Sequence, residues 1–129
     1  MSHIFPVHVY YEDTDLAGIV YHANYLRYIE RARTEWVRGL GVDQTVLKAR
    51  DGVVFAVRRV EADYIKAARF DEDLHVYTTP LKTTGVRFVL QQDVLRDQTT
   101  LFQARVMIVA MRETGQPIRL PDALHRVLR

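Results

Sequence analysis

The sequence predicts an α+β domain in which a curled antiparallel β-sheet wraps around one long amphipathic helix. Three observations support this fold class. Apolar residues recur at helical spacing over residues 23–40, a succession of β-like runs follows from residue 53, and the 129-residue chain contains no internal repeat, linker or low-complexity segment. We therefore expect a single domain over residues 1–129.

The first expected element is a strand over residues 5–11, which alternate and are rich in Val and Tyr. The residues on one face would be Val7, Val9 and Tyr11, and those on the other would be His8 and Tyr10. The strand leads into a loop that contains Glu12, Asp13 and Asp15.

The long helix is expected over residues 23–40. Its apolar face would consist of Tyr25, Ile29, Ala32, Trp36 and Leu40, and its polar face of Arg27, Arg31, Thr34 and Arg38. Gly39 and Gly41 are suited to ending it, because glycine tolerates the left-handed conformation that closes a helix. Residues 42–48 would form one further short turn.

Four further strands are expected over residues 53–64, 74–82, 86–95 and 100–111, with a polar connection at 67–72 and a short helix at 123–128. Pro80 falls late in its strand, where an edge or a bulge would tolerate its missing N–H. At about 1.5 Å per residue the long helix spans about 25 Å, too little to cover both faces and the edges of the sheet. We therefore expect a symmetric homodimer joined edge to edge. A dimer-of-dimers tetramer is the further assembly that we expect for this homodimer.

Composition excludes several classes of function. A formal net charge of +2 argues against bulk nucleic-acid binding, and the lack of cysteine excludes disulfides, thiolate metal sites and cysteine nucleophiles. The start M-S-H-I-F-P lacks a basic region followed by an apolar run, and no stretch approaches the ~20 apolar residues of a membrane span. We expect a soluble cytoplasmic protein.

The stretch over residues 11–33, which joins the first strand to the long helix, is the candidate reaction site. A carboxylate near a helix N-terminus can act as base or nucleophile, while the free N–H groups there stabilise a negative oxygen. The residues alone rank Glu12, Asp13 and Asp15 nearly equally, and turn formation or capping is the alternative for each. No second histidine lies at helical or strand spacing from His22, so we expect no metal.

Residues 9–33 resemble the hotdog-fold acyl-CoA thioesterases of the 4-hydroxybenzoyl-CoA thioesterase type, and are most similar to the bacterial subgroup associated with the Tol-Pal system. The matching residues are Tyr11, Asp13, Asp15, Gly18, Val20, Tyr21, His22, Tyr25, Glu30, Ala32 and Arg33. Weaker matches lie at residues 55–58, 68–71 and 115–121, so the resemblance covers essentially the whole chain. Two departures, Ala67 and Arg87, leave the acyl group open.

The resemblance implies that the protein hydrolyses an acyl-CoA thioester to a carboxylic acid and CoA, without a cofactor. Asp15 would be nucleophile or general base, and the backbone N–H at His22 would bind the thioester carbonyl. The implied substrate contacts are Tyr21, Tyr25, Arg58 and Arg59, and the implied structural residues of the site are Asp13, Gly18 and Glu30. Core packing is the alternative for Tyr25, and a surface pair with Arg33 is the alternative for Glu30.

The CoA phosphates call for basic residues. The candidates are Arg58, Arg59, Lys66, Arg69, Lys82 and Arg87, with a solvated basic rim as the alternative for each. Strand alternation would place Arg58 and Arg59 on opposite faces. Two other functions remain open: a non-catalytic acyl-CoA-binding module, and a hotdog hydratase or dehydratase, whose paired acid and histidine are not evident here.

Overall fold

The computed structural model describes residues 2–127 and contains five strands, three α-helices and one short 3-10 helix. In chain order the elements are β1 (His3–His8), the 3-10 helix η1 (Tyr11–Asp13), α1 (His22–Gly39), α2 (Gln44–Asp51), β2 (Val53–Tyr64), β3 (Asp73–Thr83), β4 (Arg87–Arg96), β5 (Thr99–Arg112) and α3 (Asp122–His125). The expected helix and the four later strands are all present, with no end shifted by more than one residue. The short turn expected over residues 42–48 is instead the two-turn helix α2.

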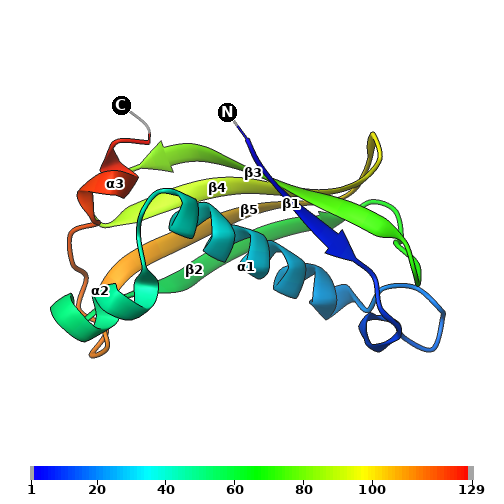
Figure 1. Ribbon diagram of the computed structural model, residues 1–129, viewed down its shortest axis with the longest axis horizontal. Helices are drawn as coiled ribbons and strands as arrows, with labels where there is room; N and C mark the ends of the chain where they lie inside the picture. Colours follow the sequence, from blue (N-terminus) through cyan, green and yellow to red (C-terminus); the bar gives the residue numbers. More distant parts are fainter. Residues whose placement is uncertain (1, 128–129) are drawn as a thin grey trace.

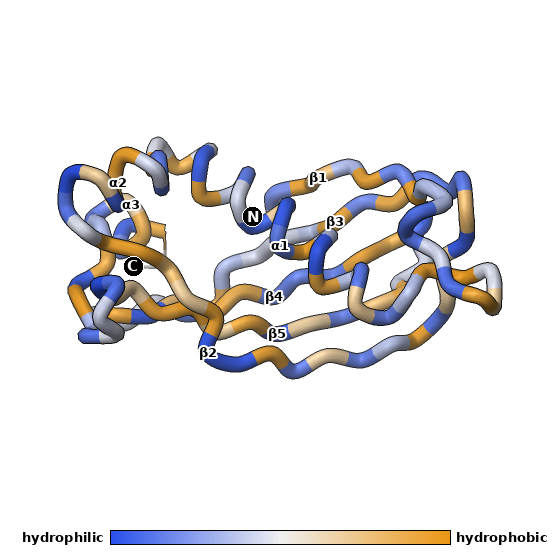
Figure 2. Tube along the Cα trace, turned by 90° about the horizontal axis from the view of Figure 1, so that it is seen from below, coloured by the Kyte–Doolittle hydropathy of each residue, from blue (hydrophilic) through white to orange (hydrophobic). Residues whose placement is uncertain are grey.

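The strands form one antiparallel sheet in the order β1-β3-β4-β5-β2. Figure 1 shows α1 lying along one face of this curved sheet, with α2 and α3 at one end and the loop between η1 and α1 at the other. Figure 2 shows the five strands side by side, with β1 and β2 at the two edges. One helix covers one face of the sheet, as the sequence predicts.

The core forms between α1 and the inward positions of the sheet, because the two elements carry apolar residues at their own periods. The buried apolar residues of α1 are Tyr25, Tyr28, Ile29, Ala32, Trp36 and Val37. On β3 and β4 every second residue is buried, which gives Leu74, Val76 and Thr78 on the first and Phe88, Leu90, Gln92 and Val94 on the second. Two of these inward positions are polar.

The expectation that the first strand continues to Tyr11 is wrong. β1 ends at His8, and Tyr11 is 81% exposed rather than part of the core face. The reason is the side chain of Asp13, whose Oδ2 accepts a hydrogen bond from the Tyr10 N–H at 2.8 Å and turns the chain into η1. Val9 remains buried and exchanges backbone hydrogen bonds with Asp71 and Glu72.

Pro80 lies at a bulge, as expected. The register of β3 against β4 shifts between Pro80 and Lys82, and β1 pairs with β3 only as far as Thr78. The missing N–H of Pro80 therefore interrupts no ladder on the β1 side.

The C-terminal helix is shorter than expected, since α3 ends at His125, and Leu128 of the expected helix lies outside the described residues. Within residues 2–127 no helix is long and apolar enough to cross a membrane.

Candidate active site

The loop before α1 folds back on itself as a tight hairpin. Thr14 and Val20 form an antiparallel bridge, and the Asp15 N–H donates to the Ile19 carbonyl at 2.9 Å. Gly18 closes the turn with φ +78°, a left-handed conformation in which a side chain is strained. The glycine of the motif thus allows the chain to reverse directly after Asp15.

Asp15 stands at the exposed turn of this hairpin. One of its carboxylate oxygens, Oδ1, accepts a hydrogen bond from the Ala17 N–H at 2.9 Å, which holds the side chain over the loop. Among the bonds of the described residues none uses its Oδ2. A carboxylate fixed through one oxygen can offer the other to a ligand.

The first residue of α1 is His22, directly after the hairpin. The Tyr21 N–H donates to the Asp13 carbonyl at 2.8 Å, and the Tyr64 hydroxyl donates to the His22 carbonyl at 2.9 Å, so both sides of the helix start are fixed. Within residues 2–127 the His22 N–H donates to no protein acceptor. A helix N-terminus with a free N–H is suited to an oxygen that carries negative charge.

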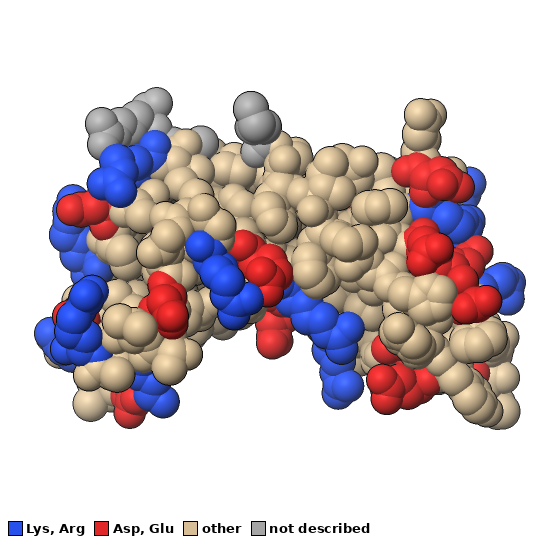
Figure 3. Space-filling model, viewed as in Figure 1, with Lys and Arg blue, Asp and Glu red and all other residues tan. Residues whose placement is uncertain are grey.

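Asp15 and His22 line the same pocket, of about 280 Å³. Its other lining residues are Ile19, Val20, Tyr25, Tyr64, Ile65, Lys66 and Ala67. The pocket therefore combines a carboxylate, the start of a helix, one ammonium group and apolar walls. Figure 3 shows acidic side chains gathered at this end of the molecule.

Asp13 does not line this pocket and is only 5% exposed. Its Oδ2 accepts from the Tyr10 N–H and its Oδ1 accepts from Asn24 Nδ2 at 2.9 Å. Its backbone N–H and carbonyl also bond to Tyr10 and Tyr21. This carboxylate is fully used in joining the loop to α1, which leaves Asp15 as the acid in the pocket.

The two tyrosines that were expected to contact the substrate differ in environment. Tyr25 is buried, stacks on Phe102 with ring centroids 5.1 Å apart, and accepts a hydrogen bond from the Ala68 N–H at 2.9 Å through its hydroxyl. Burial raises the pKa of Tyr25. Tyr21 is exposed and packs against the His22 ring, with ring centroids 4.5 Å apart. Tyr25 thus belongs to the core as well as to the pocket wall, whereas Tyr21 is open to a ligand.

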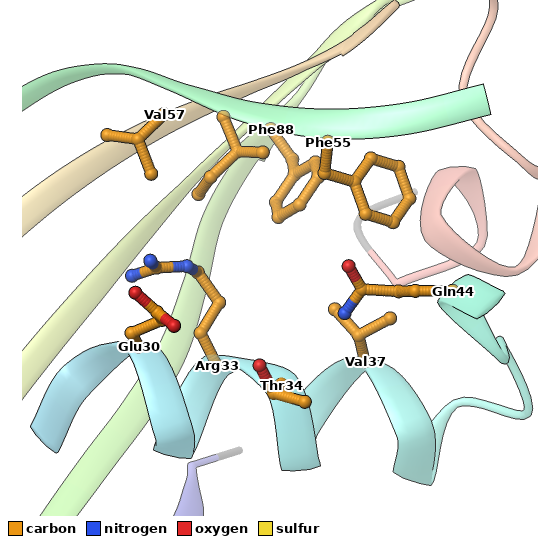
Figure 4. Close-up of a pocket in the computed structure, with 9 residues that line it drawn as sticks. Glu30, Arg33, Thr34, Val37, Gln44, Phe55, Val57 and Phe88 are labelled. Carbon is orange, nitrogen blue, oxygen red and sulfur yellow. The ribbon is translucent and has the colours of Figure 1, made fainter. Parts of the chain in front are cut away.

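Glu30 does not adjoin Asp15. It is exposed and lines a second pocket of about 230 Å³ between α1 and the sheet, so within one chain it is not a structural residue of the site around Asp15. In Figure 4, Glu30 and Arg33 point into this pocket from α1 and face Phe55, Val57 and Phe88 of the sheet. Burial lowers the pKa of Arg33, and the nearby Glu30 carboxylate opposes this shift.

Arg33 of the second pocket also belongs to a polar cluster that the sequence analysis did not predict. Gln92, fully buried in β4, accepts from Arg33 Nη1 at 2.9 Å and donates through Nε2 to the Ile29 carbonyl and to Thr78 Oγ1. One amide therefore connects α1, β3 and β4. Its signal was present in the sequence, because Gln92 occupies an inward position of an alternating strand.

The basic candidates lie in different places. Lys66 lines the pocket of Asp15, whereas Lys82 and Arg87 line a hollow on β3 and β4. Arg58 occupies a bulge of β2, so simple alternation does not separate it from Arg59. Arg59 pairs with Glu61 at 3.6 Å. Within one chain, only Lys66 among these five basic residues is brought to the pocket of Asp15.

Comparison with known proteins identifies the family. The sequence pattern of the Thioesterase-like superfamily matches residues 9–128. The chain belongs to this superfamily. The expected thioesterase class is thereby confirmed, and the residues that carry the match include the whole loop and α1.

Individual relatives agree with this membership. The chain is 37% identical to the acyl-CoA thioesterase YbgC of Haemophilus influenzae over 95% of its own length and 94% of the relative. It is 42% identical to the acyl-CoA thioesterase YbgC of Helicobacter pylori over 93% and 95% of the two chains. A probable thioesterase from Bartonella henselae superposes with a TM-score of 0.90 at 37% identity, covering 94% of this chain and 100% of that one. The fold is the expected hotdog fold.

Proposed function

We propose that this protein hydrolyses acyl-CoA thioesters to a carboxylic acid and CoA, with Asp15 as the nucleophile or general base and the His22 N–H as the carbonyl-binding donor. The observation that carries the proposal is the single pocket lined by Asp15 and His22. The relatives named acyl-CoA thioesterase support the substrate class. One domain over residues 1–129 would carry the activity.

The chemistry requires a polarised carbonyl and an oxygen nucleophile. The thioester oxygen accepts from the His22 N–H, and one such oriented donor stabilises the developing oxyanion by about 3 kcal/mol. The Asp15 carboxylate then attacks the carbonyl carbon or removes a proton from an attacking water. When the tetrahedral intermediate collapses, the C–S bond breaks and CoA leaves as a thiolate. Direct attack would leave an acyl-aspartyl anhydride, which water then hydrolyses.

Substrate contacts are assigned to side chains around this pocket. The exposed ring of Tyr21 and the wall formed by Tyr25 would contact the acyl or pantetheine part. Lys66 is suited to a phosphate of CoA because it is the basic residue that lines the pocket. Arg58 and Arg59 would reach a CoA bound to the partner subunit, since both lie on the free edge strand β2.

We also propose a homodimer in which the β2 strands of two subunits pair antiparallel. β2 is an edge strand, and its exposed apolar residues include Val57, Val60 and Tyr64. A two-fold axis at Val60 would set Arg59 opposite the partner's Glu61, a pairing of opposite charges. The same register would bring the partner's Val57 opposite Asp63, so that the second pocket of one subunit adjoins the Asp15 pocket of the other.

Three finer assignments belong to the same proposal. We propose a dimer-of-dimers tetramer, a cytoplasmic location and membership of the subgroup associated with the Tol-Pal system. A tagged chain that is recovered from cells in the membrane fraction, without any Tol or Pal protein, would contradict the last two assignments.

The decisive experiment is CoA release, followed with a thiol reagent, across short-chain, long-chain and aromatic acyl-CoA esters. We expect Asp15→Asn to lower kcat by about 10²–10⁴-fold, because the amide is neither base nor nucleophile. The control is Glu12→Gln, which removes a negative charge from an exposed residue of the same loop and should retain turnover within about twofold.

The variants separate the competing functions. A folded Asp15→Asn protein that turns over at the wild-type rate would exclude Asp15 as the catalytic acid. A wild-type protein that binds an acyl-CoA ester but releases no CoA from any of the esters would exclude hydrolysis and favour the binding module.

A further inference from the structure

His8, the last residue of β1, lies between two carboxylates. Its Nδ1 lies 2.7 Å from Asp73 Oδ1, and its Nε2 lies 2.9 Å from Asp71 Oδ1. Asp73 is the register partner of His8 on β3, and Asp71 belongs to the connection between β2 and β3. The Tyr10 ring and the imidazole pack edge to face, with ring centroids 4.9 Å apart. Both ring nitrogens are therefore engaged at once.

The protonation state of His8 decides whether both contacts can be hydrogen bonds. A neutral imidazole donates from one nitrogen only, and two ionised carboxylates can only accept, so both bonds require the imidazolium form. The charged groups that act on the ring are Asp73 and Asp71. The hydrogen bond to Asp73 is the largest cause that raises the pKa of His8 above its ordinary value of 6.5, against partial desolvation, and Asp71 adds to it.

The two carboxylates hold one end of a segment whose other end lines the candidate site. We call residues 65–72 the wall segment. Lys66 and Ala67 line the pocket of Asp15, and the Ala68 carbonyl accepts from the Val20 N–H at 2.8 Å. Arg69 forms a β-bridge with Ile19, whose carbonyl accepts from the Asp15 N–H. The wall segment therefore contacts the hairpin that carries Asp15.

The end of the wall segment near His8 is held in an unfavourable conformation. Asp71 has φ +70°, a left-handed value that residues with a side chain rarely adopt. Its N–H donates to the Val9 carbonyl at 2.9 Å, and the Val9 N–H donates to the Glu72 carbonyl at 2.9 Å. The Glu72 carboxylate is occupied elsewhere, by Arg96 and the Arg69 N–H. The bond to His8 is thus the side-chain contact that opposes the strain at Asp71.

We propose that His8, Asp71 and Asp73 form a pH-sensitive clasp that fixes the wall segment, and that His8 is a positioning residue for the candidate site. With His8 protonated, both carboxylates are bound and the wall segment is held against β1. With His8 neutral, the ring donates either from Nδ1 to Asp73 or from Nε2 to Asp71 but not to both, so Asp71 is bound for only part of the time and the wall segment opens more often. A histidine beside two carboxylates could also suggest a metal site. Within residues 2–127, however, no group of three His, Cys, Asp or Glu side chains is arranged to hold a metal ion.

The direction of the pH dependence follows from the raised pKa. A group whose pKa is higher in the folded state stabilises that state fully below its unfolded pKa, and the contribution is lost as pH rises through the folded pKa. The clasp is therefore closed in mildly acidic solution and open in alkaline solution. Because His8, Asp71 and Asp73 are partly or largely exposed, high salt should weaken it.

The test uses hydrogen exchange and proton NMR on the wild type, on His8→Gln and on His75→Gln. His75 is an exposed histidine of β3 and serves as the control. After correction for the intrinsic rate, exchange of the Ala68 and Asp71 amides in the wild type should rise about threefold between about pH 6 and pH 9. The rise should follow the titration of the His8 ring, shrink in about 1 M salt, persist in His75→Gln and vanish in His8→Gln.

Other results would overturn the clasp. A His8 ring that titrates at or below its ordinary pKa would contradict it. So would amide exchange rates in the wall segment that do not change over the pH range in which His8 titrates. Asp73→Asn should lower the pKa of His8 in a folded protein, and an unchanged pKa would exclude the pairing. These measurements need no substrate, so they fail or succeed independently of acyl-CoA hydrolysis.

Discussion

Gly18 shows how a single backbone conformation positions a reactive side chain. It has φ +78°, and a Cβ added to it would meet no atom within 4 Å, so an alanine would fit in space but not in conformation. We expect Gly18→Ala to lower the free energy of unfolding by about 1 kcal/mol, measured by urea denaturation. It should also lower kcat, because the hairpin that carries Asp15 must shift.

The matched control is Gly39→Ala. Gly39 ends α1 without a positive φ, and an added Cβ again meets nothing within 4 Å. Alanine favours a helix over glycine by up to about 1 kcal/mol, so this variant should be neutral or more stable. If both variants lost the same stability, the conformation of Gly18 would not be the cause.

The residues of the site were predictable to different degrees. The motif fixed attention on Asp15 and the start of α1, but three acids within four positions could not be ranked from their spacing. Only the folded chain shows that Asp13 is buried and bonded to Tyr10 and Asn24. Burial of a carboxylate depends on which elements close over it, and that is a property of tertiary packing rather than of local sequence.

At the scale of elements, Gln92 joins α1 to the sheet. Gln92→Leu would remove three hydrogen bonds. The Thr78 hydroxyl, the Arg33 guanidinium and the Ile29 carbonyl would each lose the partner that Gln92 provides. Each unsatisfied buried group costs about 1–3 kcal/mol, partly offset by the apolar side chain. We expect a loss of about 2–4 kcal/mol in the free energy of unfolding, measured by urea denaturation.

Its neighbour provides the comparison. Gln91 faces the other side of β4 and is half-buried. Among residues 2–127 its side chain donates only to Asp93 of its own strand, at 2.8 Å. Gln91→Leu should change stability by no more than about 0.5 kcal/mol. Equal losses in the two variants would mean that the cluster around Gln92 adds nothing beyond strand propensity.

Elements with a clear period were predicted well, and the exceptions have local causes. Four residues of the expected apolar face of α1, Tyr25, Ile29, Ala32 and Trp36, are buried. The fold also buries Tyr28 and Val37, whereas Leu40 lies just after the helix and is half-buried. β1 stops early because the Asp13 side chain bonds to the Tyr10 N–H, an interaction that periodicity does not contain. The bulge at Arg58 likewise depends on register against β5.

At the scale of the whole molecule, we expect a lysine to affect the dimer differently at the two edges of the sheet. Val60 on β2 is 39% exposed and Ile4 on β1 is 50% exposed, so a lysine at either position is tolerated by the single chain. If subunits pair through β2, Val60→Lys should weaken the dimer at least about tenfold, because two like charges would meet at the two-fold axis. Sedimentation velocity over a range of protein concentrations measures this.

Ile4→Lys is the control for the opposite edge and should leave the dimer unchanged. A wild-type protein that sediments as a monomer throughout would exclude the β2 interface. A dimer that is lost in Ile4→Lys and kept in Val60→Lys would move the interface to β1.

The hydroxyl of Tyr64 connects the edge strand β2 to the long helix α1. Tyr64 is the last residue of β2, and it donates to the carbonyl of His22, the residue that begins α1. If subunits pair through β2 as proposed, the strand that joins them also holds the start of α1, where the candidate site lies. A substitution at Tyr64 would then alter both the contact between subunits and the support of the first residue of α1, so the number of subunits and the turnover must be measured together.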